Sequence, residues 1–165
     1  MASQPPHPAT EFLCEVSITL DADAPLPVGA SPWRNRRVSD IAGGRFAGPR
    51  LSGAVRRSGA DWSEGGRAAD GGIATAIDVR SLWQTDEGAL IYVTYPGRLV
   101  VPADKVPEFR DPARVTTLTE SAYYFRICPV FETSAEPYLW LNEIVALGIG
   151  RRTADGVVYR MFQVL

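Results

Sequence analysis

Short runs in which hydrophobic and polar residues alternate recur along most of the chain. The first covers 11–21 (EFLCEVSITLD) and places Phe12, Cys14, Val16, Ile18 and Leu20 on one face. Strict alternation of this kind is typical of a half-buried β-strand. The other segments expected to be strands are 43–53, 54–57, 73–85, 89–95, 98–101, 139–147 and 157–165. The segment 33–41, which carries three arginines, is expected to be a solvated strand or loop, with an anion site as the less favoured alternative.

Turn sequences separate these runs. The segment TDEG at 85–88 joins two strong runs and predicts a β-hairpin. The aromatic stretch 122–142 is divided by Pro129 and Pro137, and we expect it to form a second hairpin. The glycines of 43–53 indicate a bulge or a barrel corner.

Helical signals are nearly absent. The proline-containing segment 102–112 is the one place where a helical turn is expected, and no run of 12 residues has a helical period. Eight or more short strands with turn signals between them predict an all-β fold, either a barrel or a sandwich.

Length and charge set the broad class. A chain of 165 residues fits one domain, which we expect over 11–165 after a disordered, proline-rich leader at 1–10. The leader does not have the pattern of a signal peptide, and no apolar run approaches the roughly 20 residues that span a bilayer. With a net charge of −2 and no basic stripe, we expect a cytoplasmic protein that binds neither nucleic acid nor membrane.

The residue inventory excludes several chemistries. His7 is the only histidine, so a Ser–His or Cys–His nucleophile pair and a histidine-based zinc site are not expected. Lys105 is the only lysine and is a poor Schiff-base candidate, and two cysteines are too few for a disulfide framework. We expect no cofactor and no metal, which leaves carboxylates, arginines, tyrosines and asparagine for acid–base work.

Seven short motifs occur in order along nearly the whole chain. Together they resemble the bacterial and fungal family known as domain of unknown function 3237. The resemblance implies a single closed antiparallel β-barrel with a central cavity and little helix, but no general activity. The motifs are GGRFAGP at 43–49, GADW at 59–62, DVR at 78–80, TDEGA at 85–89, YYFR at 123–126, FET at 131–133 and YLWLN at 138–142.

Residues two apart on a strand share a face, so Asp78 and Arg80 project together. Two further pairs follow the same rule, Tyr124 with Arg126 and Trp140 with Asn142. These polar sets either face water around an apolar core or line a polar lumen. We favour the lumen, because the polar face carries bulky aromatics, Asp78 and Arg80 make a compact pair, and the family motifs fall on the same residues.

A polar lumen would supply acid–base groups. The expected general bases are Asp61, Asp78 and Glu132, since burial among aromatics raises the pKa of a carboxyl group. Arg80 or Arg126 would stabilise an enolate or phenolate oxygen, and Tyr124 would donate a proton. The expected substrate-binding residues are Trp62, Trp140 and Asn142. The alternatives are that the Asp78–Arg80 pair only fixes barrel register and that Asp61 is a turn residue.

Three functions therefore stay open. The leading hypothesis is a cofactor-independent isomerase, cyclase or lyase acting on an aromatic or enolisable carbonyl compound. The second is a non-catalytic barrel that binds a small molecule, and the third is a structural homo-oligomer. Apolar outer faces would fit a homodimer.

Overall fold

The computed structural model describes residues 7–165, and the eleven strands of this part of the chain belong to one antiparallel sheet. Residues 1–6, most of the leader expected at 1–10, lie outside the described part, and the first strand already begins at Thr10. The strands are β1 (Thr10–Leu20), β2 (Leu26–Ala30), β3 (Asn35–Ala47), β4 (Ser52–Asp61), β5 (Glu64–Arg67), β6 (Ile73–Thr85), β7 (Leu90–Val101), β8 (Tyr124–Ile127), β9 (Val130–Glu132), β10 (Ala146–Arg152) and β11 (Gly156–Val164). The helical segments are the 3-10 helices η1 (Ala103–Lys105), η2 (Val115–Thr117) and η3 (Glu136–Glu143) and the short α1 (Val106–Arg110).

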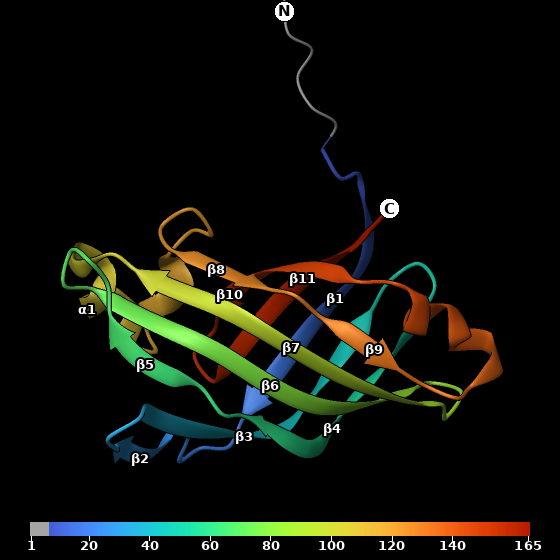
Figure 1. Ribbon diagram of the computed structural model, residues 1–165, viewed down its shortest axis with the longest axis horizontal. Helices are drawn as coiled ribbons and strands as arrows, with labels where there is room; N and C mark the ends of the chain where they lie inside the picture. Colours follow the sequence, from blue (N-terminus) through green and yellow to red (C-terminus); the bar gives the residue numbers. More distant parts are fainter. Residues whose placement is uncertain (1–6) are drawn as a thin grey trace, which may run out of the picture.

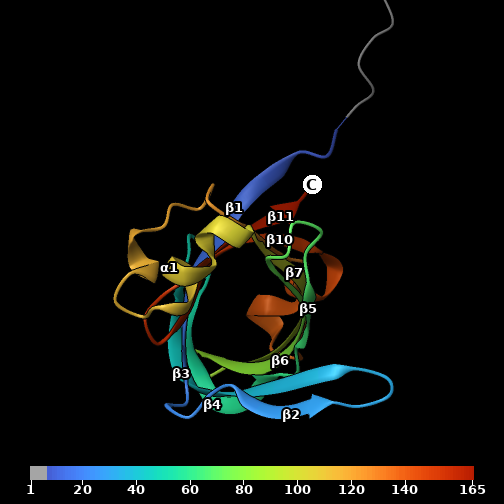
Figure 2. The same ribbon diagram turned by 90° about the vertical axis from the view of Figure 1, so that its left-hand side faces the viewer.

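The strands close into a barrel (Figures 1 and 2). Eight of them form the ring, in the order β3, β1, β11, β10, β8, β7, β6, β4 and back to β3. The other three strands add to this ring. Strand β9 pairs with the part of β7 that precedes the part paired with β8. Strand β5 pairs with β3 and β6 at one end, and β2 pairs with β3. Closure leaves no open sheet edge in the ring. The expected closed antiparallel barrel is confirmed.

Most of the expected strands are present, and the 73–85 and 89–101 hairpin is the longest paired unit. The predicted helical turn at 102–112 contains η1 and α1. Two strands were not anticipated, β2 and β5, both in segments rich in proline or glycine that read as loops.

Three details of the predicted pattern are wrong. The aromatic stretch 122–142 does not form a hairpin, because β8 and β9 both pair with β7, one after the other along its length, and not with each other. Phe12 does not lie on the buried face of β1, because the pairing with β11 shifts register between Phe12 and Cys14; its side chain lies outside against Phe162. The strand expected at 139–147 begins only at Ala146, and the preceding residues form η3. In η3 the buried Tyr138 and Leu141 are three residues apart, which is a helical spacing.

One half of the barrel is filled by side chains. The ring of Trp83 stacks on Phe46 with centroids 4.6 Å apart and meets Phe131 edge to face at 6.1 Å. We call these three residues the aromatic plug. Trp83 is fully buried, and its indole N–H donates to the hydroxyl of Ser81 at 3.1 Å. The plug occupies the end of β6 farther from α1, so the other half of the barrel is the place where a cavity can form.

Candidate functional site

The half of the barrel near α1 contains a cavity of about 580 Å³. Figure 2 looks along the barrel from this end, with α1 in front. Along β6 the cavity is lined by Ile73, Thr75, Ile77 and Val79, the inward residues that precede Ser81 and the aromatic plug. Such a volume is in the range of small-molecule sites. The expected central cavity is confirmed.

The residue at the centre of this site is Asp61, the last residue of β4. The ladder aligns Asp61 with Ser39 of β3 on one side and with Val79 of β6 on the other, and Val79 is aligned with Tyr95 of β7. Directly paired residues project to the same side of a sheet. Asp61 therefore points inward together with the buried Val79 and Tyr95, and all three line the cavity.

The surroundings of Asp61 make it a weak acid. Burial, and then the charge of Asp78, raise the pKa of Asp61 to about 6 from its ordinary 3.8. The backbone N–H of Asp78, which donates to Oδ1 of Asp61 at 3.2 Å, the hydroxyl of Ser63 and the charge of Arg37 oppose this rise. Desolvation is the largest effect, so the pKa of Asp61 lies within reach of neutral pH.

Two tyrosines complete the interior. Tyr95 and Tyr159 are buried and meet edge to face, with ring centroids 5.6 Å apart. Burial raises the pKa of both hydroxyls well above 10, and the charge of Asp61 raises both further. Both groups therefore remain protonated. The hydroxyl of Tyr159 donates to the hydroxyl of Tyr95, so the O–H of Tyr95 is the one left to donate to an oxygen atom in the cavity.

A cation lies beside this wall. Arg37 of β3 lines the cavity, and its Nη2 donates to the hydroxyl of Thr75 at 3.4 Å. Its guanidinium lies over Gly65, where a Cβ atom would come within 2.6 Å of Nη2. Within residues 7–165, no carboxylate lies within 4.0 Å of the Arg37 guanidinium. Glycine at position 65 thus makes room for a guanidinium that is free to face a ligand.

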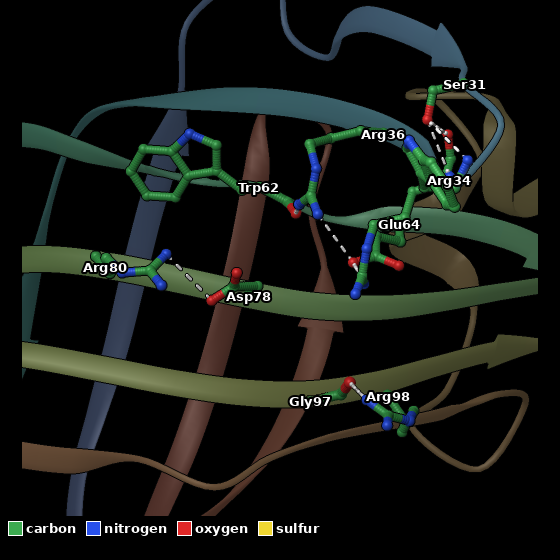
Figure 3. Close-up of polar contacts among 10 residues, drawn as sticks. Ser31, Arg34, Arg36, Trp62, Glu64, Asp78, Arg80, Gly97 and Arg98 are labelled. Atoms are coloured by element: carbon green, nitrogen blue, oxygen red, sulfur yellow. Dashed lines mark hydrogen bonds and ion pairs between the residues drawn. The ribbon is translucent and has the colours of Figure 1, made fainter.

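Of the nine site residues expected from the sequence, Asp61 lines the cavity and the structure does not bring the other eight to it. The inward orientation expected for Asp78 and Arg80 is wrong. Their side chains are 48% and 49% exposed and pair with each other at 3.2 Å on the outer face of β6 (Figure 3). Val79, between them, takes the inner face, because Asp61 and Val79 are aligned in the ladder.

The remaining candidates lie on the outside or in the end structures. Trp62 is half-buried, with the Arg80 guanidinium 5.4 Å from its ring (Figure 3), and Arg126 lies 5.0 Å over the exposed Tyr124. Glu132 is exposed on β9. In η3, Trp140 is half-buried under Arg50. Asn142 fastens the loop before η3, because its side chain exchanges hydrogen bonds of 2.9 Å with the backbone of Thr133.

Sequence reasoning missed Tyr95, Tyr159 and Thr75, and it left Arg37 in the segment 33–41, for which an anion site was only the less favoured interpretation. A signal for the tyrosines was available, because each continues an apolar alternation, with Ile91 and Val93 before Tyr95 and with Met161 after Tyr159. A tyrosine in such a position is buried and needs a polar partner. Arg37 gave no such signal, since it lies among two other arginines in a polar segment.

The described residues hold no group of three or more His, Cys, Asp or Glu side chains arranged to bind a metal ion. None of the helices in residues 7–165 is both long enough and apolar enough to cross a bilayer.

Fold and site together define a class, a closed antiparallel β-barrel that is solid at one end and holds a small-molecule cavity with a half-buried carboxyl group at the other. The family model described as "Protein of unknown function (DUF3237)" matches residues 8–164, and the chain belongs to this family.

Relatives with similar sequences are known from bacteria and a fungus. A UPF0311 protein of Rhodopseudomonas palustris is 31% identical over 130 residues, which cover 79% of this chain and 80% of that protein. The hydroalkoxylation enzyme phnH of Penicillium herquei is 30% identical over 149 residues, which cover 90% of this chain and 78% of the enzyme. A solved β-barrel-like protein of Acinetobacter baumannii superposes with a TM-score of 0.78 at 32% identity and covers 99% of this chain and 100% of its own.

Proposed function

We propose that this protein is an enzyme that adds an O–H group across an activated C=C bond of a small aromatic or enolisable carbonyl compound, or catalyses the reverse elimination, without a cofactor. The observation that carries the proposal is Asp61, a carboxyl group with a pKa of about 6 that faces a cavity of about 580 Å³. Efficient general bases have a pKa close to the working pH.

Asp61 would act as the proton carrier. At neutral pH its ionised form predominates and can accept the proton of a substrate hydroxyl. The oxygen then attacks the carbon of the C=C bond remote from the carbonyl. The electron pair of that bond forms the C=C bond of an enolate, and the electron pair of the carbonyl moves onto its oxygen. As the carbonyl re-forms, the protonated Asp61 returns the proton to carbon; the addition needs no oxidant or reductant, and within one molecule the product is an isomer of the substrate.

Three side chains near Asp61 can stabilise the negative charge that develops on the substrate oxygen. An enolate oxygen forms in the transition state and needs hydrogen-bond donors fixed in advance. Arg37 supplies a positive charge with no carboxylate of the described residues within 4.0 Å, and Tyr95 and Tyr159 supply neutral hydroxyls. The apolar residues of the cavity, Ile77 and Leu99 among them, would exclude water from the reacting atoms.

The name of one relative supports this reaction class. Hydroalkoxylation is the addition of an O–H group across a C=C bond, and the Penicillium herquei enzyme of that name is 30% identical to this chain. Such an addition within one molecule is a cyclisation.

The test uses 2'-hydroxychalcone, whose phenolic O–H adds to its own enone to give flavanone with a large change in absorbance. We expect the wild type to accelerate this cyclisation and Asp61→Asn to lose at least 100-fold in kcat/KM. Asp78→Asn is the matched control, because it removes a carboxylate that lies between the cavity-facing Ile77 and Val79 on β6 but projects from the outer face. A chalcone that binds the cavity stoichiometrically but is not converted would favour the non-catalytic binding barrel. Equal rates for wild type and Asp61→Asn would refute the assignment of Asp61.

A further inference from the structure

Three arginines line the cavity, and the proposed reaction uses only Arg37. The other two, Arg110 of α1 and Arg152 at the end of β10, lie at the cavity end that α1 covers. Arg152 is half-buried, whereas Arg110 is exposed. The α1 end of the cavity thus carries two positive charges that the proposed reaction does not use.

Arg152 is held in a fixed position. Its Nη1 donates to the backbone carbonyl of Phe109 at 2.8 Å, and its guanidinium lies 5.0 Å from the ring centroid of the same residue. Its backbone N–H donates to the hydroxyl of Tyr123 at 3.0 Å. A guanidinium has five N–H donors in a planar fork, so one bond to a carbonyl leaves the group able to bind further acceptors.

Neither of these charges forms an ion pair with another of the described residues. Among residues 7–165, no carboxylate approaches Arg110 or Arg152 within 4.0 Å. Burial lowers the pKa of Arg152, which reflects the cost of removing its charge from water. A charge that is desolvated beside a cavity and unpaired by the protein gains most from an anion in that cavity.

The carboxylates that line the same end do not fill this role. Asp21 forms an ion pair with Arg57, a residue that does not line the cavity; Nη2 of Arg57 lies 3.1 Å from Oδ1 of Asp21. Asp155 accepts a hydrogen bond of 3.1 Å from the hydroxyl of Thr153, its neighbour in the β10–β11 turn. Both acidic groups therefore already have partners.

We propose that the ligand of this cavity is an anion, with a carboxylate bound by Arg152 and Arg110 at the α1 end. The planar fork of a guanidinium matches the two oxygens of a carboxylate. This inference rests on the proposed function only in taking the cavity as the ligand site. Among aromatic or enolisable carbonyl compounds, it favours those that carry an acidic group remote from the reacting O–H and C=C over neutral ones such as 2'-hydroxychalcone.

The test compares two probes of the same shape, 2-naphthoate and 2-naphthamide, by isothermal titration calorimetry with the whole chain. We expect the wild type to bind the carboxylate at least tenfold more tightly than the amide. Arg110→Gln and Arg152→Gln should each reduce this ratio severalfold, with the affinity for the amide unchanged. Arg152→Lys, which keeps the charge, should restore part of the preference.

Arg151→Gln is the matched control, because Arg151 is adjacent in sequence and does not line the cavity. It should leave the ratio as in the wild type. Equal binding of the two probes by the wild type, or a ratio unchanged in both Arg110→Gln and Arg152→Gln, would overturn the inference.

The same titrations separate this inference from the proposed reaction. If the wild type does not cyclise 2'-hydroxychalcone but still prefers 2-naphthoate to 2-naphthamide, and Asp61→Asn keeps that preference, the anion site is upheld and the proposed reaction is refuted. Failure of both probes to bind at all would overturn the anion site and would also remove the cavity as the place of the reaction.

Discussion

The carboxylate of Asp61 accepts a hydrogen bond of 3.2 Å from the backbone N–H of Asp78, while the side chains of the two residues lie on opposite sides of the barrel wall. The ladder is the reason, because Asp61 is aligned with Val79 and not with Asp78. One carboxylate therefore lies beside a cavity and the other in solvent, although both belong to motifs of the same family. Their different surroundings make them a natural pair for mutagenesis.

Replacing Asp61 should make the protein more stable at high pH while removing its activity. The pKa of Asp61 is raised from 3.8 to about 6 on folding, so its ionised form costs up to about 3 kcal/mol of folding free energy. Asp61→Asn cannot ionise and should be the more stable protein at pH 8 in urea denaturation. Asp78→Asn, at an exposed site, should change stability by no more than about 0.5 kcal/mol. If Asp61→Asn were less stable than the wild type at pH 8, the ionised Asp61 carboxylate would not destabilise the folded protein.

The pH dependence of stability has a definite sign. The folded protein binds the Asp61 proton more tightly than the unfolded chain, so the contribution is fully present below about pH 3.8 and is lost as the pH rises through about 6. The difference in unfolding free energy between the wild type and Asp61→Asn should therefore change between pH 4 and pH 7 and be constant above that range. A difference independent of pH would show that Asp61 titrates as an ordinary carboxyl group.

The position of Arg37 depends on the glycine beneath it. A Cβ atom at position 65 would lie 2.6 Å from Nη2 of Arg37, closer than such atoms pack. Gly65→Ala should therefore displace the guanidinium and lower kcat for the cyclisation about tenfold, with a melting temperature within a few degrees of the wild type. The control is Gly66→Ala, where the nearest atom would be 3.7 Å away, in ordinary contact. Equal losses in the two variants would point to general damage to β5.

The two tyrosine hydroxyls are expected to serve the ligand and not the fold. Tyr95→Phe and Tyr159→Phe keep the edge-to-face contact of 5.6 Å but remove a donor from the cavity. Each should lower kcat by 10- to 100-fold and leave the far-UV circular dichroism spectrum unchanged. Tyr92→Phe, on the outer face of β7 and 40% exposed, is the matched control. Full activity in both cavity variants would exclude these hydroxyls from the reaction.

The aromatic plug fills the barrel beyond the cavity, and its three residues are not among those that line the cavity. Trp83→Ala removes a fully buried ring that stacks on Phe46 and should cost about 3–5 kcal/mol in urea denaturation. Trp33→Ala, at a site 87% exposed, should change stability by no more than about 0.5 kcal/mol. A small loss from Trp83→Ala would mean that the filled half of the barrel collapses around the vacated volume.

Elements whose signals are local could be predicted. The hairpin of β6 and β7 follows from strict alternation on both sides of a turn sequence, and the short helices after it follow from their prolines. The segment 136–143 could not be placed in this way, because its aromatic residues also fit a strand. In the structure this segment is a 3-10 helix, which buries Tyr138 and Leu141 on one side.

By itself, the sequence determined an all-β chain, its family, and the fact that Asp78 and Arg80 share one face of a strand. It also placed Asp61 among the candidate bases. Only the tertiary structure decided which face of β6 is inside, because that depends on the register between β4 and β6 and on the closure of the ring. Alternation has a period of two and looks the same from either side of a sheet. Burial of Val79 and Tyr95 on the inner face, far apart in the sequence from Asp61, resolved that ambiguity and placed the carboxyl group in the cavity.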